Sequence, residues 1–240
     1  MKYFIDIHCH CLPQVDDGAK SIEETLAMMK IAYEEGIRTI IATPHFKGRD
    51  RGLAPEKLEE VVEFVNALLV RENIGIKIYR GNELFYNSEV SEILREGRLS
   101  TLADSSYVLV EFYPNEDFRT IKAGLYDILS SGYVPVLAHV ERYKNINKIQ
   151  EVEELLELGV YIQVNASSIL GDMGRSAKSF VKKLLKKRYV HFVASDAHSP
   201  RSRAPRLITC ASYLEKKYGS EYVEELFYYN PMMIIENELN

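Results

Sequence analysis

The sequence predicts a single-domain α/β barrel, in which seven parallel strands alternate with helices over residues 1–240. Short β-branched runs alternate with segments of helical apolar spacing, a pattern typical of a parallel sheet buried on both faces. A His, Asp or Glu lies at or just past the carboxyl end of six of the seven predicted strands, and barrel enzymes place their sites on that rim. A doubly wound sheet usually has a glycine-rich first turn, which this sequence lacks, so a barrel is the better prediction.

The first strand is predicted to begin almost at residue 1, because residues 2–5 are apolar and β-prone. Side chains alternate along a strand. His8 and His10 are therefore expected on one face, and Cys9 and Cys11 on the other. Two neighbouring imidazoles at the end of a strand are well placed to hold a metal ion.

A helix and a second strand follow. Ser21 and Glu24 form a capping box, and apolar residues then recur at helical spacing as far as Gly36. Ile37 to Ala42 is a short β-branched run, which predicts a buried strand that ends just before His45.

The third unit begins with a polar loop from Lys47 to Gly52, which leads to Pro55, a favourable first residue of a helix. A strand is predicted from Ile76 to Tyr79, and it ends in Gly81-Asn82-Glu83. Four further strands are predicted at 107–110, 134–138, 160–164 and 190–194. Helices are predicted over 118–130, over about 152–158, over the lysine-rich stretch before the last strand, and from about 205 onward, where the tyrosines are expected to pack in the core.

Composition points to a soluble, cytoplasmic protein. The net charge of −5 argues against a general nucleic-acid surface, and no apolar run approaches the length of a membrane-spanning helix. Asp6 interrupts the first apolar stretch, so no signal peptide is predicted. Three cysteines make no even disulfide framework and suit a reducing compartment. The basic cluster at 182–188 is interpreted as the solvent-facing side of an amphipathic helix.

Nine ionisable side chains are predicted to converge at the carboxyl rim of the barrel. So many charged groups could share a small site only with cations to offset their repulsion and desolvation. Their number suffices for two or three ions, and mixed imidazole and carboxylate donors suit Mn, Fe or Zn. Glu83, in a predicted loop, has the weakest individual case, and His191 at the opposite rim is expected to be structural. The nine residues are His8, His10, Asp17, His45, Glu83, Glu111, His139, Asp196 and His198.

Six motifs resemble those of the polymerase-and-histidinol-phosphatase (PHP) superfamily, and more narrowly its capsule-regulating bacterial tyrosine phosphatases of the CpsB/YwqE type. The resemblance covers nearly the full chain in order and spacing, and it implies the PHP fold, a distorted (β/α)7 TIM-like barrel. Val140 stands where many relatives have Pro. The motifs are His8-Cys9-His10, Asp16-Asp17-Gly18, Ala42-Thr43-Pro44-His45, Gly81-Asn82-Glu83, His139-Val140-Glu141-Arg142 and Ser195-Asp196-Ala197-His198.

The resemblance implies a trinuclear site with manganese as the usual metal and Fe or Zn as alternatives. Arg142 and Arg203 match positions that bind substrate phosphate, and Asp17 is grouped with them as a catalytic residue. The implied ligand sets are His8, His10, Glu83 and Asp196 for one metal, Glu83, Glu111 and His139 for a second, and Asp17, His45 and His198 for a third.

The implied function is hydrolysis of phosphotyrosine on a protein, expected to be the C-terminal tail of a bacterial tyrosine kinase that controls capsular or exopolysaccharide synthesis. In such chemistry a metal-bridging hydroxide attacks phosphorus, while the cations and arginines absorb charge on the oxygens. The alternative within the superfamily is a phosphatase for histidinol phosphate or another small phosphomonoester.

Three rivals lie outside this superfamily. A cysteine-dependent phosphatase needs an Arg six positions after the Cys, where Cys9, Cys11 and Cys210 have Val15, Asp17 and Lys216. An amidohydrolase barrel would typically have a bridging Lys at strand four, where this chain has Glu111. A metal-binding regulatory protein without turnover stays open until activity on an aryl phosphate is measured.

Overall fold

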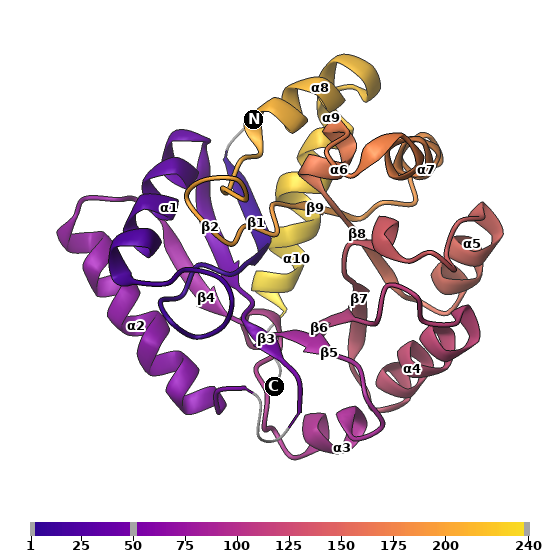
Figure 1. Cartoon of the computed structure of the whole chain (residues 1–240), viewed down its shortest axis with the longest axis horizontal. Helices are drawn as coiled ribbons and strands as arrows, with labels where there is room; N and C mark the ends of the chain where they lie inside the picture. The colour runs from indigo at the N-terminus through magenta and orange to yellow at the C-terminus, as the bar shows by residue number, and fades with distance from the viewer. Residues whose placement is uncertain (1–2, 49–51, 238–240) are drawn as a thin grey trace.

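The computed structural model describes residues 3–48 and 52–237, so the start of the first predicted strand and part of the loop predicted from Lys47 to Gly52 lie outside it. Within these ranges strands and helices alternate along the chain, as predicted (Figure 1). The strands are β1 (Phe4–Cys9), β2 (Ile37–Ala42), β3 (His45–Phe46), β4 (Lys77–Arg80), β5 (Glu83–Phe85), β6 (Tyr107–Glu111), β7 (Val134–Leu137), β8 (Tyr161–Asn165) and β9 (Phe192–Ala194).

The helices lie mostly on the outside of these strands (Figure 1). Ser21 caps the first of them, because its Oγ accepts a hydrogen bond from the Glu24 N–H at 3.3 Å. The carboxylate of Glu24 accepts from the N–H of Lys20 rather than from that of Ser21, so the predicted capping box is only half formed. The second helix begins at Pro55, as predicted. None of the described helices combines the length and the apolarity needed to cross a membrane. The helices and turns are α1 (Ile22–Glu34), α2 (Pro55–Arg71), α3 (Val90–Arg95), η1 (Leu102–Asp104), α4 (Phe118–Ser130), η2 (Val140–Arg142), α5 (Ile149–Glu157), α6 (Ala166–Leu170), α7 (Gly174–Lys186), α8 (Ile208–Tyr218), α9 (Ser220–Glu224), the π-helical turn η3 (Glu225–Tyr229) and α10 (Asn230–Glu236).

The strands form a curled parallel sheet in two hydrogen-bonded sections, ordered β1-β2-β4 and β3-β5-β6-β7-β8-β9. The sections join because β2 continues into β3 and β4 continues into β5. The remaining edges meet through a parallel bridge between Cys9 and Ala197, where the N–H of His10 donates to the Ala197 carbonyl at 2.8 Å. The predicted distorted barrel of seven parallel strands is confirmed.

Breaks within the second and third barrel strands correct two predicted strand ends. His45 and Glu83 were expected just past their strands, but they are the first residues of β3 and β5. Pro44, in the first break, has no N–H to give to the ladder, and its carbonyl accepts from the N–H of Glu83 at 3.2 Å. A Cβ on Gly81, in the second break, would lie 2.9 Å from the Ile41 side chain. The breaks place both ligand candidates inside the sheet rather than on loops.

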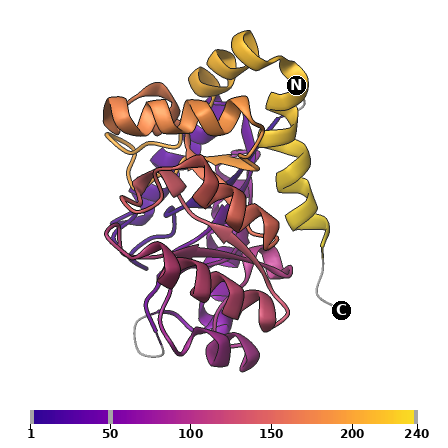
Figure 2. The ribbon, with the colours of Figure 1, turned by 90° about the vertical axis from the view of Figure 1, so that its right-hand side faces the viewer.

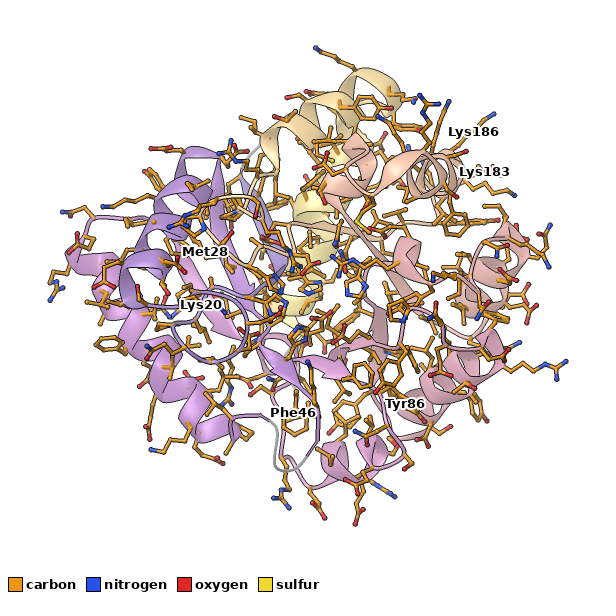
Figure 3. All side chains as sticks on the ribbon, in the orientation of Figure 1. Lys20, Met28, Phe46, Tyr86, Lys183 and Lys186 are labelled. Atoms are coloured by element: carbon orange, nitrogen blue, oxygen red, sulfur yellow. The ribbon has the colours of Figure 1, made fainter. Side chains whose placement is uncertain are left out.

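Two apolar cores hold the barrel together. One fills its interior with residues such as Ile5, Ile7 and Phe192, all fully buried. The other lies between strands and helices, and Met28 of α1 points into it (Figure 3). The lysines of α7 that were predicted to face solvent do so, as Lys183 and Lys186 in Figure 3 show.

Helix α10 covers the end of the barrel where the strands begin (Figure 2). Its Ile234 is buried in the interior core, and Ser106 Oγ, just before β6, donates to Asn237 Oδ1 at 2.9 Å. Because this end is covered, the open rim is the one where the strands finish. Packing of the C-terminal tyrosines is confirmed for Tyr222, which is buried, but Tyr229 is 51% exposed.

Candidate metal centre

The structure brings all nine predicted ligand candidates together at the carboxyl rim. Their nitrogen and oxygen atoms form four overlapping groups, within each of which the atoms lie no more than 4.8 Å apart. The groups are His8, His10 and Asp196; His8, Glu83 and His139; His45, Glu83 and Glu111; and His10, Asp17, His45 and His198.

Glu83 is the central carboxylate, which corrects its ranking as the weakest candidate. Its Oε1 lies 2.8 Å from His139 Nε2, and its Oε2 lies 3.3 Å from His8 Nε2, 3.2 Å from His10 Nε2 and 3.1 Å from His45 Nδ1. It is 1% exposed. The sequence placed Glu83 in a loop because the break after Gly81 conceals that β5 begins there.

The grouping agrees in part with the ligand sets implied by the resemblance. His8, His10 and Asp196 lie together, and Asp17, His45 and His198 lie together with His10 added. The expected set of Glu83, Glu111 and His139 is divided, because Glu111 Oε1 lies 3.0 Å from His45 Nδ1 and its Oε2 lies 3.8 Å from His139.

Sequence reasoning missed the role of Asp16, which orients two of the histidines. Its Oδ2 lies 2.6 Å from His10 Nδ1 and accepts the backbone N–H of His45 at 3.0 Å. Its Oδ1 accepts the N–H of Gly18 at 2.9 Å. A Cβ on Gly18 would lie 2.1 Å from the carbonyl oxygen of His10, so only glycine lets the loop carrying Asp17 lie against β1. The Asp-Asp-Gly spacing was the available signal.

A buried amide pair in β8 was also missed. Gln163 Oε1 accepts the His139 N–H at 2.8 Å and lies 3.2 Å from His8 Nδ1. Gln163 Nε2 donates to Asn165 Oδ1 at 2.8 Å, and Asn165 Nδ2 donates to Asp196 Oδ2 at 2.8 Å. This chain links three ligand candidates from three strands. Its signal was a pair of amides at alternate positions in an otherwise apolar strand.

Two ligand candidates adopt a left-handed backbone conformation. The φ angles are 33° at His139, two residues after the end of β7, and 52° at Asp196, two residues after the end of β9. Such conformations cost about 1–2 kcal/mol for residues other than glycine, and they concentrate at functional sites. Here each turn directs a side chain from the end of its strand towards Glu83 and His8.

Electrostatics at the rim favour cations. Burial lowers the pKa of His10, but Asp16 and Glu83 outweigh it and raise that pKa to about 9. The carboxylates of Glu111 and Glu83 likewise overcome burial and raise the pKa of His45 to about 10. Burial raises the pKa of Glu83, but the surrounding histidines hold it well below its usual range. Carboxylates that retain protons on imidazoles this strongly would also retain metal cations.

The donor set fits such cations. His45 Nδ1 is buried and makes no hydrogen bond within the described residues, although carboxylate oxygens of Glu83 and Glu111 lie 3.1 and 3.0 Å away. A metal ion bound by this nitrogen and these carboxylate oxygens would require them to lie close together without bonding to one another. Cys9 and Cys11 belong to the apolar core outside the barrel and to none of the four groups, as strand alternation predicted. The donors are therefore nitrogen and oxygen, which suit Mn, Fe and Zn.

Both predicted arginines bind Asp196. Arg142 Nη2 donates to Asp196 Oδ2, and Arg203 Nη2 donates to Asp196 Oδ1 at 2.9 Å. Their side chains are 28% and 43% exposed, so donors on each guanidinium still face the solvent. The pocket they share with the ligand candidates has a volume of about 310 Å³ and an apolar wall that includes Phe85 and Pro114.

A curled parallel barrel with an imidazole and carboxylate cluster at its carboxyl rim defines a metal-dependent hydrolase. The chain belongs to the CpsB/CapC family of capsular polysaccharide synthesis proteins, whose model matches residues 4–236. The predicted family is therefore confirmed.

Two curated relatives are similar over nearly their whole length. The tyrosine-protein phosphatase CpsB of Streptococcus pneumoniae is 37% identical, covering 98% of this chain and 99% of the relative. The tyrosine-protein phosphatase YwqE of Bacillus subtilis (strain 168) is 36% identical, covering 97% and 89%.

Comparison with solved structures gives the same fold. A structure from work on YwqE of Bacillus subtilis and CpsB of Streptococcus pneumoniae, described there as unique metal-dependent tyrosine phosphatases, matches with a TM-score of 0.91 at 35% identity, covering 98% of this chain and 95% of that one. The histidinol phosphate phosphatase of Lactococcus lactis, complexed with Zn, L-histidinol and phosphate, matches with a TM-score of 0.59 at 16% identity, covering 90% and 94%. The second likeness shows a shared fold alone.

Proposed function

We propose that this chain is a metal-dependent protein-tyrosine phosphatase, like the relatives it resembles over nearly its whole length. The observation that carries the proposal is an open pocket lined by seven of the nine ligand candidates and by two arginines, with His8 and His10 buried beside them in the same ligand groups. The cluster accounts for metal dependence, and the arginines account for recognition of a phosphoryl group.

Three cations, with manganese as the first candidate, are assigned to the cluster. Bound cations supply positive charge that stabilises phosphoryl oxygens and lowers the pKa of water towards neutrality. Asp17, which is 64% exposed and lies 3.4 Å from His45 and 3.6 Å from His198, belongs to the open, substrate-facing side. The proposed ligand sets are those that the family resemblance implies, and Glu111, which lies nearer to His45 than to His139, would then turn towards His139. The sets are His8, His10, Glu83 and Asp196; Glu83, Glu111 and His139; and Asp17, His45 and His198.

The two arginines bind and orient the phosphate. Each guanidinium gives one nitrogen to Asp196 and keeps further N–H donors for phosphoryl oxygens. Asp196 thus fixes their direction, and burial at 2% exposure strengthens both contacts. Charge that builds up on the phosphoryl oxygens during transfer is met by donors that are already in place.

An aromatic wall beside the ligands suits a phenyl ester better than an alkyl one. Phe85 lines the pocket, and the ring of Tyr113 packs edge-on against it, with centroids 4.5 Å apart and Tyr113 62% exposed. A tyrosine ring on the substrate could pack against this surface. The proposed substrate is the phosphotyrosine-bearing tail of a bacterial tyrosine kinase in capsule synthesis, met in the cytoplasm.

The test compares three substrates on protein stripped of metal and reloaded separately with Mn, Fe and Zn. A phosphotyrosine peptide is expected to exceed a phosphoserine peptide and histidinol phosphate in kcat/KM, with no turnover before metal is added. If histidinol phosphate is preferred more than tenfold, the tyrosine assignment is wrong and only the metallophosphatase assignment survives.

A further inference from the structure

A second pocket adjoins the proposed catalytic one. It has a volume of about 210 Å³ and lies between α6 and the segment that joins β9 to α8, elements that lie close together in Figure 1. Arg142, Asp196 and Arg203 line both pockets, so the arginine pair forms the boundary between them. Whatever occupies the second pocket therefore lies next to the phosphoryl group.

The wall of this pocket carries a local excess of positive charge. It contains four arginines and two aspartates, Asp172 and Asp196, and Asp196 is already bound by the two boundary arginines. The other two, Arg201 and Arg206, are exposed and make no ion pair with any residue in the described ranges. This excess occurs in a chain whose net charge is −5, so it is a local feature that would attract anions.

We propose that the second pocket binds another anionic group of the same substrate chain, on a residue close in sequence to the phosphotyrosine. The inference rests on the proposed function. An extended peptide advances about 3.3 Å per residue, so a side chain one to three positions away can reach a pocket that shares a wall with the phosphate site. A carboxylate and a phosphate both match the guanidinium fork of Arg201 and Arg206.

Asp172 allows a second test of the proposal, in which the expected change in substrate selectivity is opposite to that caused by loss of the arginines. Its carboxylate lies on the same wall and would repel an incoming anion. Asp172→Asn is therefore expected to strengthen selection for an anionic neighbour, whereas loss of Arg201 and Arg206 weakens it. A pocket wall with only a structural role would not produce opposite changes.

The experiment uses the full chain loaded with metal and three phosphotyrosine peptides of equal length. Their residues adjacent to phosphotyrosine are alanine, aspartate or a second phosphotyrosine, and the readout is the ratio of kcat/KM for each anionic peptide to that for the alanine peptide. Arg71→Gln is the matched control, because Arg71 is exposed at the end of α2, next to the strand starts on the opposite face.

We expect a wild-type ratio of about three- to tenfold, consistent with exposed ion pairs, and a decrease at high salt. Arg201→Gln with Arg206→Gln should bring the ratio close to one, Asp172→Asn should raise it, and Arg71→Gln should leave it unchanged. Preference for the aspartate peptide assigns the pocket to a carboxylate, and preference for the doubly phosphorylated peptide assigns it to a phosphate.

A wild-type ratio near one, or a ratio that the double arginine variant does not change, would overturn the proposal. If none of the peptides is hydrolysed, the proposed function itself fails. The pocket is then judged by the dissociation constants of matching peptides that carry a non-hydrolysable phosphonate in place of the phosphate, with the same ratios expected for the same variants.

Discussion

The Nε2 atoms of His8, in β1, and His10, just after β1, lie 3.2 Å apart, although only one residue separates the two histidines. His8 Nδ1 lies against Gln163, and His10 Nδ1 lies 2.6 Å from Asp16, so both rings direct Nε2 towards the same point. Two neutral imidazole nitrogens that share one point repel each other through their lone pairs unless a proton or a metal ion lies between them.

His8→Ala is therefore expected to abolish turnover and lower the bound metal, because it removes a donor from two of the four ligand groups. The measurement is elemental analysis together with kcat on an aryl phosphate. His191→Ala is a control for the loss of an imidazole, since His191 lies before β9 at the opposite rim. Full activity in a metal-free His8→Ala protein would contradict the multinuclear site.

Gln163→Leu tests the positioning of His8 and His139. The change removes the acceptor for both residues and leaves buried donors unpaired. Metal affinity is expected to fall about 10- to 100-fold, as for other residues that orient metal ligands. Competition with a metal-binding dye measures this loss. Gln150→Leu on the exposed side of α5 should show none, and unchanged affinity in Gln163→Leu would mean that other contacts hold His8.

Arg142→Ala and Arg203→Ala test phosphate recognition. Each should lose a charged hydrogen bond of about 1.5–3 kcal/mol. At about 1.4 kcal/mol per decade, kcat/KM should fall roughly ten- to hundredfold while elemental analysis still finds the metals. Arg71→Ala serves as the control. If metal content falls enough to account for the lost rate, the arginines act by positioning Asp196 as a metal ligand rather than by binding phosphate.

Cys9→Ser combined with Cys11→Ser should retain metal and most of the rate, because both thiols lie in the apolar core away from the ligand groups. Some stability should be lost, since hydroxyl groups replace buried thiols. Metal content and thermal unfolding are measured together. Lost metal in a folded variant would show that a thiol faces the cluster.

His191 should give the fold a dependence on acid pH. Burial lowers its pKa to about 4, whereas an unfolded histidine titrates near 6.5. The folded state thus resists protonation, so stability present above about pH 6.5 is lost as the pH falls towards 4. Urea unfolding of wild type and His191→Asn should show free energies of unfolding that converge over this range. If the free energies of unfolding of the two proteins differ by a constant amount from pH 7 to pH 4, His191 is not the source of the pH dependence.

The sequence by itself determined the barrel and the identity of the ligand candidates. Local signals suffice for both: the helix-capping Ser21, Pro55 at the start of a helix, and β-branched runs such as Ile37–Ala42 reflect interactions over a few residues. Residues at the ends of parallel strands also share one rim whatever the details of packing, so the convergence of His8 with Asp196 could be predicted.

Only the tertiary structure decided how those candidates are grouped. Three features depend on strand register and on turns far apart in sequence. They are the contacts of Glu83 with several histidines, the hydrogen bonds that link Gln163 to Asp196, and the hydrogen bonds of both arginines to Asp196. The break at Pro44 depends on a backbone hydrogen bond to the neighbouring strand, and the break at Gly81 depends on close packing against the Ile41 side chain. Such distances of a few ångströms arise from packing across the barrel, and no local pattern of residues encodes them.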